Sequence, residues 1–348
     1  MLVLHIGTQK TGTAALQAYL AENADALLEQ GIHYLKAGRV RSHGDLAQAL
    51  KGKADIALWE EAREELQNSG SPTQVISAEG LWVSDPVALR NALPAGIPVR
   101  IVVYLRRQDK YLQSLWKQGV TGGRKGDFRT WLEATPYKGD YLATIEQWAS
   151  VFGADSLVIR PYERPDGANT VADFCRIIGA VGLPPPENVR RNFSPRRELL
   201  HFMRALNNAD VNMNHRNLFR AVIAKNSAYI RSSDMLSNEE AAELMARYAE
   251  GNRILAERYY HDSSTPLFPE LTPSPPPEIW PLDSEEFFQL TVDVFEALIE
   301  QALAGKIYEG GKENGNRKKT RRAKRRAQRS GPAGTRDEAE AVEGVPAA

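Results

Sequence analysis

The feature that most constrains this 348-residue chain lies at its start, in the segment LVLHIGTQKTGTAAL from Leu2 to Leu16. A short apolar run typical of a strand is followed by a turn rich in glycine and threonine, and then by a stretch that predicts a helix. Gly7 and Gly12 let the backbone adopt dihedral angles that a Cβ atom would forbid. The first amides of the helix lack an intrahelical acceptor, and with the helix dipole they favour a phosphate. The segment therefore predicts an anion site built largely from backbone.

Side chains in the same turn strengthen this prediction. Lys10 adds a full positive charge, and Thr11 and Thr13 add hydroxyl donors. The turn is not a Walker A sequence, because in GxxxxGK[ST] the lysine follows the second glycine, whereas Lys10 precedes Gly12. The chemistry indicated is phosphate binding without the usual magnesium-binding hydroxyl after the lysine.

The run Gln9-Lys10-Thr11-Gly12-Thr13 resembles the 5′-phosphosulfate loop of sulfotransferases that use 3′-phosphoadenosine 5′-phosphosulfate (PAPS). With the continuation Ala14-Ala15-Leu16 it is most similar to QKTGTTAL in the N-deacetylase/sulfotransferases of heparan synthesis. The resemblance implies that PAPS is the cofactor and that Lys10 also bonds the bridging oxygen of the leaving group. It assigns the 5′ end of PAPS to Gln9, Lys10, Thr11, Gly12, Thr13 and Ala14. Ala14 departs from the family pattern, which has a second threonine there, so one hydroxyl donor is missing.

A second part of the cofactor site is expected after the apolar run that ends at Leu105. Arg106 follows that run directly, and Ser114 comes eight positions later in RRQDKYLQSLW. A guanidinium and a hydroxyl at one point above a sheet suit a terminal phosphate. The spacing is similar to the 3′-phosphate motif RNPxDxxxS of the same family, although Arg107-Gln108 replaces Asn-Pro.

A third part is expected after the apolar run that ends at Arg160. Pro161-Tyr162-Glu163 resembles the YED segment of the family, whose tyrosine lies near the adenine. Tyr162 is a candidate for stacking on the base. A tyrosine that only closes the end of the sheet would give the same pattern.

Sulfuryl transfer requires a base that accepts the proton of the acceptor. In cytosolic sulfotransferases a histidine fills this role just after the strand that precedes the arginine strand. By resemblance, the equivalent position in this chain is Glu79, in Ile76-Ser77-Ala78-Glu79. A partly desolvated carboxylate near an anion would have a raised pKa suited to this role. The alternative is that Glu79 caps the turn before Gly80 or pairs with a nearby lysine or arginine. The second candidate is His43, whereas His5 lies inside the first strand and is expected to be a core residue.

The order of elements predicts a P-loop-type, doubly wound parallel α/β sheet flanked by helices, with additional C-terminal helices. Short runs rich in Val, Ile and Leu suit strands that are covered on both faces. The predicted strands are Leu2–Ile6, Gln74–Ala78, Val99–Leu105 and Leu157–Arg160. The predicted helices are Thr13–Glu29, Ile56–Asn68, Pro86–Ala92, Lys110–Gln118, Leu142–Val151 and Thr170–Ile178. The segments Leu35–Ala54 and Gly119–Lys138 are expected to be loops that carry acceptor specificity.

We expect one domain over residues 1–305, with an α/β core at 1–183 and a helical part at 184–305. The helical part is predicted to contain Leu199–Asn207, His215–Ala224, Asn238–Tyr260 and Ser284–Ala304, with Thr272–Pro281 as a linker. Ser237 and Glu240 predict a capping box at the start of the third of these helices. Residues 306–348 lack hydrophobic periodicity and are expected to form a disordered tail, first basic and then acidic.

Composition limits the class of protein. The formal net charge is zero, but Lys312 to Arg329 is crowded with basic residues, so the part before it must be acidic. Cys175 is the single cysteine, which fits a reducing compartment. The chain has neither an 18-residue apolar run nor a signal-like start, so we expect a cytoplasmic protein without a transmembrane span.

These observations favour an enzyme that transfers a sulfuryl group from PAPS to a hydroxyl or amine, with no metal required. The similarity to glycan enzymes favours a carbohydrate acceptor. One alternative is a P-loop kinase or nucleotide hydrolase, which needs a strand-end aspartate for magnesium; the predicted strand ends carry Glu79 and Arg106 instead. Another is a polyanion-binding protein that acts through Lys312 to Arg329.

Overall fold

The computed structural model describes residues 1–163, 169–184, 195–209, 214–225, 234–260, 266–268 and 284–303, the last helix with side chains at 288–300. The predicted linker Thr272–Pro281 and the predicted tail 306–348, including Lys312 to Arg329, lie outside these residues.

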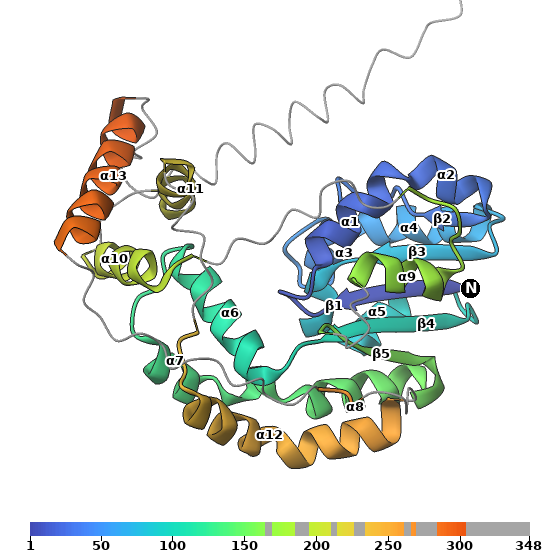
Figure 1. Cartoon of the computed structure of the whole chain (residues 1–348). Coiled ribbons are helices and arrows are strands. Elements are labelled where there is room, and N and C mark those ends of the chain that lie inside the picture. The colour runs from blue at the N-terminus through green and yellow to red at the C-terminus, as the bar shows by residue number, and fades with distance from the viewer. Residues whose placement is uncertain are drawn as a thin grey trace, which may run out of the picture.

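A five-stranded parallel sheet forms the centre of the α/β part (Figure 1). Its order is β2-β3-β1-β4-β5, and every neighbouring pair is parallel. The strands are β1 Leu2–Gly7, β2 Ile32–Tyr34, β3 Thr73–Ser77, β4 Val99–Leu105 and β5 Leu157–Pro161. The chain builds β2 and β3 on one side of β1 and then crosses to the other side for β4 and β5. The strand order therefore reverses at β1, and ligands of such sheets bind beyond the carboxyl ends of the strands at this reversal.

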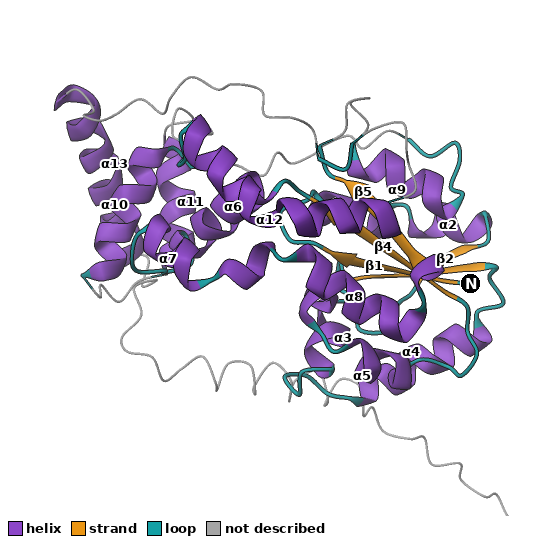
Figure 2. Cartoon of the chain, turned by 90° about the horizontal axis from the view of Figure 1, so that it is seen from below, coloured by secondary structure: helices purple, strands orange, loops and turns teal. Residues whose placement is uncertain are grey.

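Helices cover both faces of the sheet, which confirms the predicted doubly wound α/β class (Figure 2). On one face, Val3, Tyr104 and Phe174 belong to a buried cluster shared with three helices, α1 Thr13–Glu22, α2 Ala24–Glu29 and α9 Thr170–Ile178. On the other face, Trp59 and Trp148 belong to a larger core formed with α3 Gly44–Ala49, α4 Ala57–Asn68, α5 Pro86–Ala92 and α8 Tyr141–Phe152. The strands are buried on both sides, which explains their continuous apolar sequences.

A helical part lies beside the sheet in Figure 1. It contains α6 Gln108–Val120, α7 Phe128–Ala134, α10 Arg197–Asn208, α11 His215–Lys225, α12 Asn238–Tyr259 and α13 Ser284–Leu303. Helix α6 packs on α7, α10 and α12, while α12 also contacts α8 and β5. Three short 3₁₀ segments complete the described elements: η1 Glu79–Val83, η2 Pro136–Gly139 and η3 Ala154–Ser156.

The structure differs from the sequence-based prediction in three places. The edge strand β2 was not predicted, because three residues are too few to show a pattern. The helix predicted over Thr13–Glu29 is divided at Asn23, whose side-chain amide donates to the carbonyl of Tyr19 at 2.9 Å and competes with the helical ladder. The two expected specificity loops contain α3 and α7, and Asp127 caps α7 by accepting from the Thr130 amide. The capping box of Ser237 and Glu240 is confirmed.

Candidate active site at the carboxyl ends of the strands

The loop between β1 and α1 is folded around the carbonyl oxygen of Thr8. The hydroxyls of Thr11 and Thr13 both donate to this oxygen, at 2.6 Å and 2.9 Å. Thr8 is itself tied to β4, since its amide and its hydroxyl each donate to the carbonyl of Tyr104 at 3.0 Å. A hydroxyl has one proton to donate. In this structure Thr11 and Thr13 therefore shape the loop, and the donors that face an anion are the backbone amides.

Gly12 occupies a position that tolerates no side chain. Its φ of 77° is left-handed, and a Cβ atom there would lie 3.1 Å from the hydroxyl oxygen of Thr170 and 3.4 Å from the ring of Tyr162. The amides of Ala15 and Leu16 donate to the carbonyl of Gly12, so those of the preceding helical residues have no intrahelical acceptor. This open helix N-terminus lies where the sequence predicted an anion site, and helix N-termini of this kind favour anions. Ala14 is exposed at its edge.

Lys10 lies partly buried beside the loop, with a left-handed φ of 65°. Burial lowers the pKa of its ammonium group, the charge of Glu79 raises it, and the charge of Arg106 lowers it further. Among the residues that the structure describes, none accepts a hydrogen bond or forms an ion pair with this ammonium group. Lys10 is thus a desolvated cation that interacts electrostatically with Glu79, which follows β3, and with Arg106, which follows β4.

Glu79 opens η1 directly after β3. Burial raises the pKa of its carboxyl group, and the charge of Lys10 opposes that shift. The backbone of Glu79 packs on the loop, because a Cβ atom on Gly7 would lie 3.5 Å from its Cα. The carboxylate also raises the pKa of the neighbouring Tyr111, after burial as the larger cause. Glu79 therefore lies where the sequence predicted a base.

Arg106 is held at the end of β4 by residues that follow β5. Its Nε donates to Glu163 at 2.6 Å, and its guanidinium carbon lies 5.3 Å from the centre of the Tyr162 ring. Its carbonyl accepts from the hydroxyl of Tyr141 at 2.7 Å. The ring of Tyr162 thus lies between Arg106 and Gly12, so the three predicted segments meet at one edge of the sheet.

Ser114 lies partly buried in α6, and among the described residues no hydrogen bond joins it to Arg106. Sequence reasoning missed two lysines on its face of the helix, Lys110 and Lys117, which lie four residues before it and three after. Burial lowers the pKa of Lys117 to about 8; Asp234 opposes the shift, and Arg106 is the largest of the cations that add to it. The spacing from Ser114 was the signal that could have found them.

The two buried histidines near the first strand are structural. His43 is fully buried, accepts at Nδ1 from the amide of Ser77 at 3.0 Å and donates from Nε2 to the carbonyl of Leu35 at 2.9 Å. Burial lowers the pKa of His43 to about 4 and that of His5 to about 3. With both ring nitrogens engaged, His43 has no site for a further proton, so we do not retain it as a candidate base.

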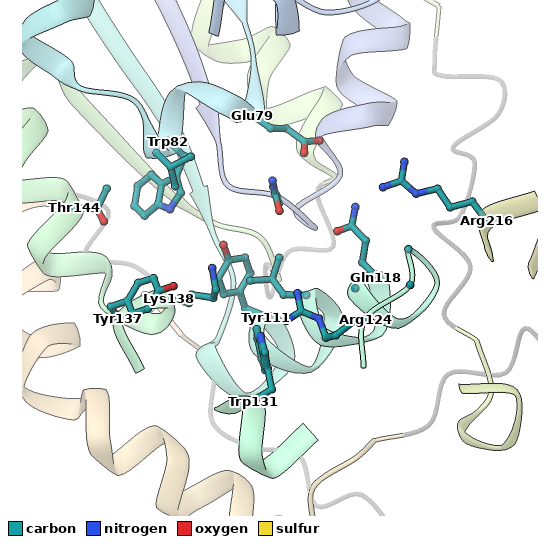
Figure 3. A pocket seen from close by; sticks show the side chains of 16 residues that line it. Glu79, Trp82, Tyr111, Gln118, Arg124, Trp131, Tyr137, Lys138, Thr144 and Arg216 are labelled. Carbon is teal, nitrogen blue, oxygen red and sulfur yellow. The ribbon is translucent and has the colours of Figure 1, made fainter. Parts of the chain in front are cut away.

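A cleft of about 710 Å³ opens beside the loop, between the edge of the sheet and the helical part (Figure 3). Gln9 and Glu79 line its inner side. The remaining wall comes from η1, α6, the turn after α6, α7, η2, α8 and α11. Gln9, which was predicted to belong to the phosphate loop, therefore also lines this cleft.

The described residues contain no group of three or more His, Cys, Asp or Glu side chains arranged to hold a metal ion. Within the same part of the chain, no helix has the length and apolar character required to cross a bilayer.

Comparison with known proteins gives distant matches, and no family model matches the chain. An uncharacterized protein of Archaeoglobus fulgidus is 28% identical over 173 residues, which are 46% of this chain and 46% of that protein. The chain thus aligns with less than half of that relative. Among solved structures, a sulfotransferase from Alicyclobacillus acidocaldarius has a TM-score of 0.38 and 19% identity, over 66% of this chain and 98% of that one. Matches at this level of similarity carry no functional assignment.

Proposed function

We propose that this protein is a sulfotransferase that moves a sulfuryl group from PAPS to a hydroxyl or amine, most readily of a carbohydrate. One observation carries the proposal: a desolvated Lys10 with no partner in the described residues, between Glu79 after β3 and Arg106 after β4. A lysine in this state suits a ligand that brings negative charge to it. The glycine cradle at the start of α1 supports the same assignment.

The residues present fit a doubly phosphorylated nucleotide. Backbone amides at the start of α1 would bind the 5′ phosphate, with Gln9 and Lys10 beside them. Arg106, Ser114 and the lysines of α6 would bind the 3′ phosphate, since guanidinium and ammonium groups pair well with phosphate oxygens. Tyr162, next to Gly12 and Arg106, is proposed to contact the adenine.

PAPS would supply the sulfuryl group. The acceptor oxygen or nitrogen forms a bond to sulfur while the bond from sulfur to the bridging phosphate oxygen breaks. Glu79 accepts the proton that the acceptor loses, and its raised pKa suits that transfer. Lys10 neutralises the charge that develops on the bridging oxygen, an interaction strongest in the transition state.

Calorimetry tests the donor site. We expect 3′-phosphoadenosine 5′-phosphate (PAP) to bind more tightly than ADP, with the same affinity with and without magnesium. Arg106→Gln should weaken the binding of PAP. The matched control is Arg253→Gln, because Arg253 pairs with Glu250 and Glu257 on the exposed side of α12. Magnesium-dependent binding of a nucleoside triphosphate in preference to PAP would instead support a P-loop kinase or hydrolase.

The remaining expectations stay predictions. They are a cytoplasmic location, inferred from the single Cys175, a small-molecule or glycan acceptor as partner, and a polyanion contact through Lys312 to Arg329. Deletion of residues 306–348 tests whether the tail is an accessory to the enzyme: PAP affinity and transfer should survive, and their loss would make the tail part of the active site.

A further inference from the structure

Three cations that line the cleft lack acidic partners. Arg124, Lys138 and Arg216 face this space, and no carboxylate in the described part of the chain lies within ion-pair distance of any of them. Several cations elsewhere on the helical part are paired, in Arg129–Glu240, Arg247–Glu133 and Arg258–Glu146. The cleft therefore carries positive charge that no acidic side chain of the described residues pairs with.

Arg124 is the best positioned of the three. Its guanidinium lies 4.9 Å from the centre of the Trp131 ring, and its Nε is buried without a hydrogen-bond partner. Its backbone is held at both ends, because its amide donates to the carbonyl of Gly119 and its carbonyl accepts from Asn207, each at 2.8 Å. Burial lowers the pKa of this guanidinium. A desolvated cation held in this way is preorganised to bind an anion, because little ordering is needed when the anion binds.

Gly119 makes room for this arrangement. A Cβ atom at Gly119 would lie 2.0 Å from the Nε of Arg124, so any side chain there would displace the guanidinium. Gly119 lies in α6, where alanine is the better helix former. The glycine thus weakens the helix at a position where its small size admits Arg124 to the cleft.

Aromatic rings form much of the remaining wall. Trp82, Tyr111, Trp131 and Tyr137 line the cleft from η1, α6, α7 and η2. Figure 3 shows Glu79 on one side of the space, Arg124 and Trp131 on the opposite side, and Arg216 on a third. Aromatic faces offer apolar area to a ring, and the cleft volume lies within the usual range for small-ligand sites.

We infer that the acceptor is an acidic carbohydrate, whose carboxylate or sulfate group binds Arg124 and, at the rim, Arg216, while its hydroxyl or amine reaches Glu79. This inference rests on the proposed function and adds the charge class of the acceptor. Among the described residues that line the cleft, Glu79 is the one acidic side chain and Arg124, Lys138 and Arg216 are the cations, so an acidic acceptor meets one negative group and three positive ones there. Arg124 contributes more than the exposed Arg216, because exposed charges are screened.

Matched acceptors test the inference. A uronic-acid-containing oligosaccharide, its carboxyl-reduced neutral counterpart and a tyrosine peptide with acidic neighbours are each supplied with PAPS, and sulfuryl transfer is measured. Binding of the two sugars to PAP-saturated protein is measured in parallel by calorimetry. The variants are Arg124→Gln, Gly119→Ala and Arg216→Gln, with Arg253→Gln as the matched control outside the cleft.

We expect the acidic sugar to be used about tenfold better than its reduced counterpart, as kcat/KM. Arg124→Gln and Gly119→Ala should each remove this preference, lowering kcat/KM for the acidic sugar on the order of ten- to a hundredfold, mainly through KM. Arg216→Gln should cost about threefold. All variants should keep the PAP affinity of the unmodified protein, and Arg253→Gln should change neither quantity.

Equal use of the two sugars, a preference that survives Arg124→Gln, or sulfation of the tyrosine peptide in place of the sugars would overturn the inference. So would a failure to sulfate the acidic sugar by protein that binds PAP normally. Failure of the unmodified protein to bind PAP is a different result, since it rejects the proposed function itself.

Discussion

The loop after β1 and the wall of the cleft differ in how their functional groups are held. In the loop, Thr11 and Thr13 bind the carbonyl of Thr8, and the donors left for a ligand are backbone amides. In the wall, the functional groups are long side chains such as Arg124, which rests on Trp131. A site made of backbone amides is preorganised, but it distinguishes ligands by little more than their charge and size. A side-chain wall can discriminate, because single substitutions change its charge and shape. Under the proposed function, the donor would therefore bind at the loop, and the wall of the cleft would select the acceptor.

Glu79 lies between the two regions, and its substitution should have the largest effect. Glu79→Gln removes the base while keeping the size of the side chain, so kcat should fall by about 10²- to 10⁴-fold. PAP affinity should be retained, as calorimetry would show. The melting temperature should rise, because the raised pKa means that the ionised carboxylate destabilises the folded state at neutral pH. Unchanged transfer would remove Glu79 from the mechanism.

Lys10→Ala should lower kcat by about 10²- to 10³-fold, because its charge acts mainly on the leaving group. The affinity for PAPS should fall much less, because its bridging oxygen has not yet gained that charge and the backbone amides of the loop remain. The measurement is the split between kcat and the dissociation constant of PAPS determined without acceptor. An equal loss in both quantities would place Lys10 among the ground-state contacts and weaken the view of the loop as a backbone site.

The pH dependence sharpens the position of Glu79. The base must be ionised to accept a proton, and burial raises the pKa of the Glu79 carboxyl above the ordinary glutamate value of 4.5. The rate should therefore fall about tenfold per pH unit on an acid limb whose midpoint lies above that value. Lys10 opposes the shift, so Lys10→Ala should move the residual limb to higher pH. A limb that does not move would show that the two groups are not coupled.

Arg106 and Arg124 test the division between donor and acceptor regions directly. Arg106→Gln should weaken PAP on the order of ten- to a hundredfold and reduce its advantage over adenosine 5′-phosphate, without changing acceptor preference. Arg124→Gln should change acceptor preference and leave the affinity for PAP unchanged. Either variant affecting both quantities equally would break the comparison. Calorimetry and competition between acceptors give the two readouts.

Ala14→Thr should have the smallest effect. Ala14 is exposed at the start of α1, so the structure has room for the hydroxyl that the resembled family carries there. One added hydrogen bond should tighten PAP binding by about two- to tenfold. The matched variant Ala14→Val has the same shape without the hydroxyl and should give no gain. A gain with valine would indicate packing in place of hydrogen bonding.

Much of the fold could be predicted, because long apolar strands and strongly periodic helices are local features. The central strands and the capping box of α12 show this. Strand β2 and the break at Asn23 could not, since a three-residue edge strand and a side-chain hydrogen bond have no periodic signal. In the site, the order of Lys10, Glu79 and Arg106 along the chain indicated their meeting point. The engagement of both nitrogens of His43 could not be read, because Leu35 and Ser77 come from separate segments.

The sequence alone determined the anion loop at Leu2 to Leu16 and the parallel α/β class, because backbone dihedrals, open helix amides and hydrophobic periodicity depend on residues close together in the chain. Tertiary structure decided which groups are desolvated and which cations have no acidic partner among the described residues. Lys10, desolvated beside the loop, and Arg124, which lines the cleft, are the two examples. Desolvation and ion pairing depend on neighbours that come from distant segments, here from Gln9 to Arg216, so only the folded chain defines them.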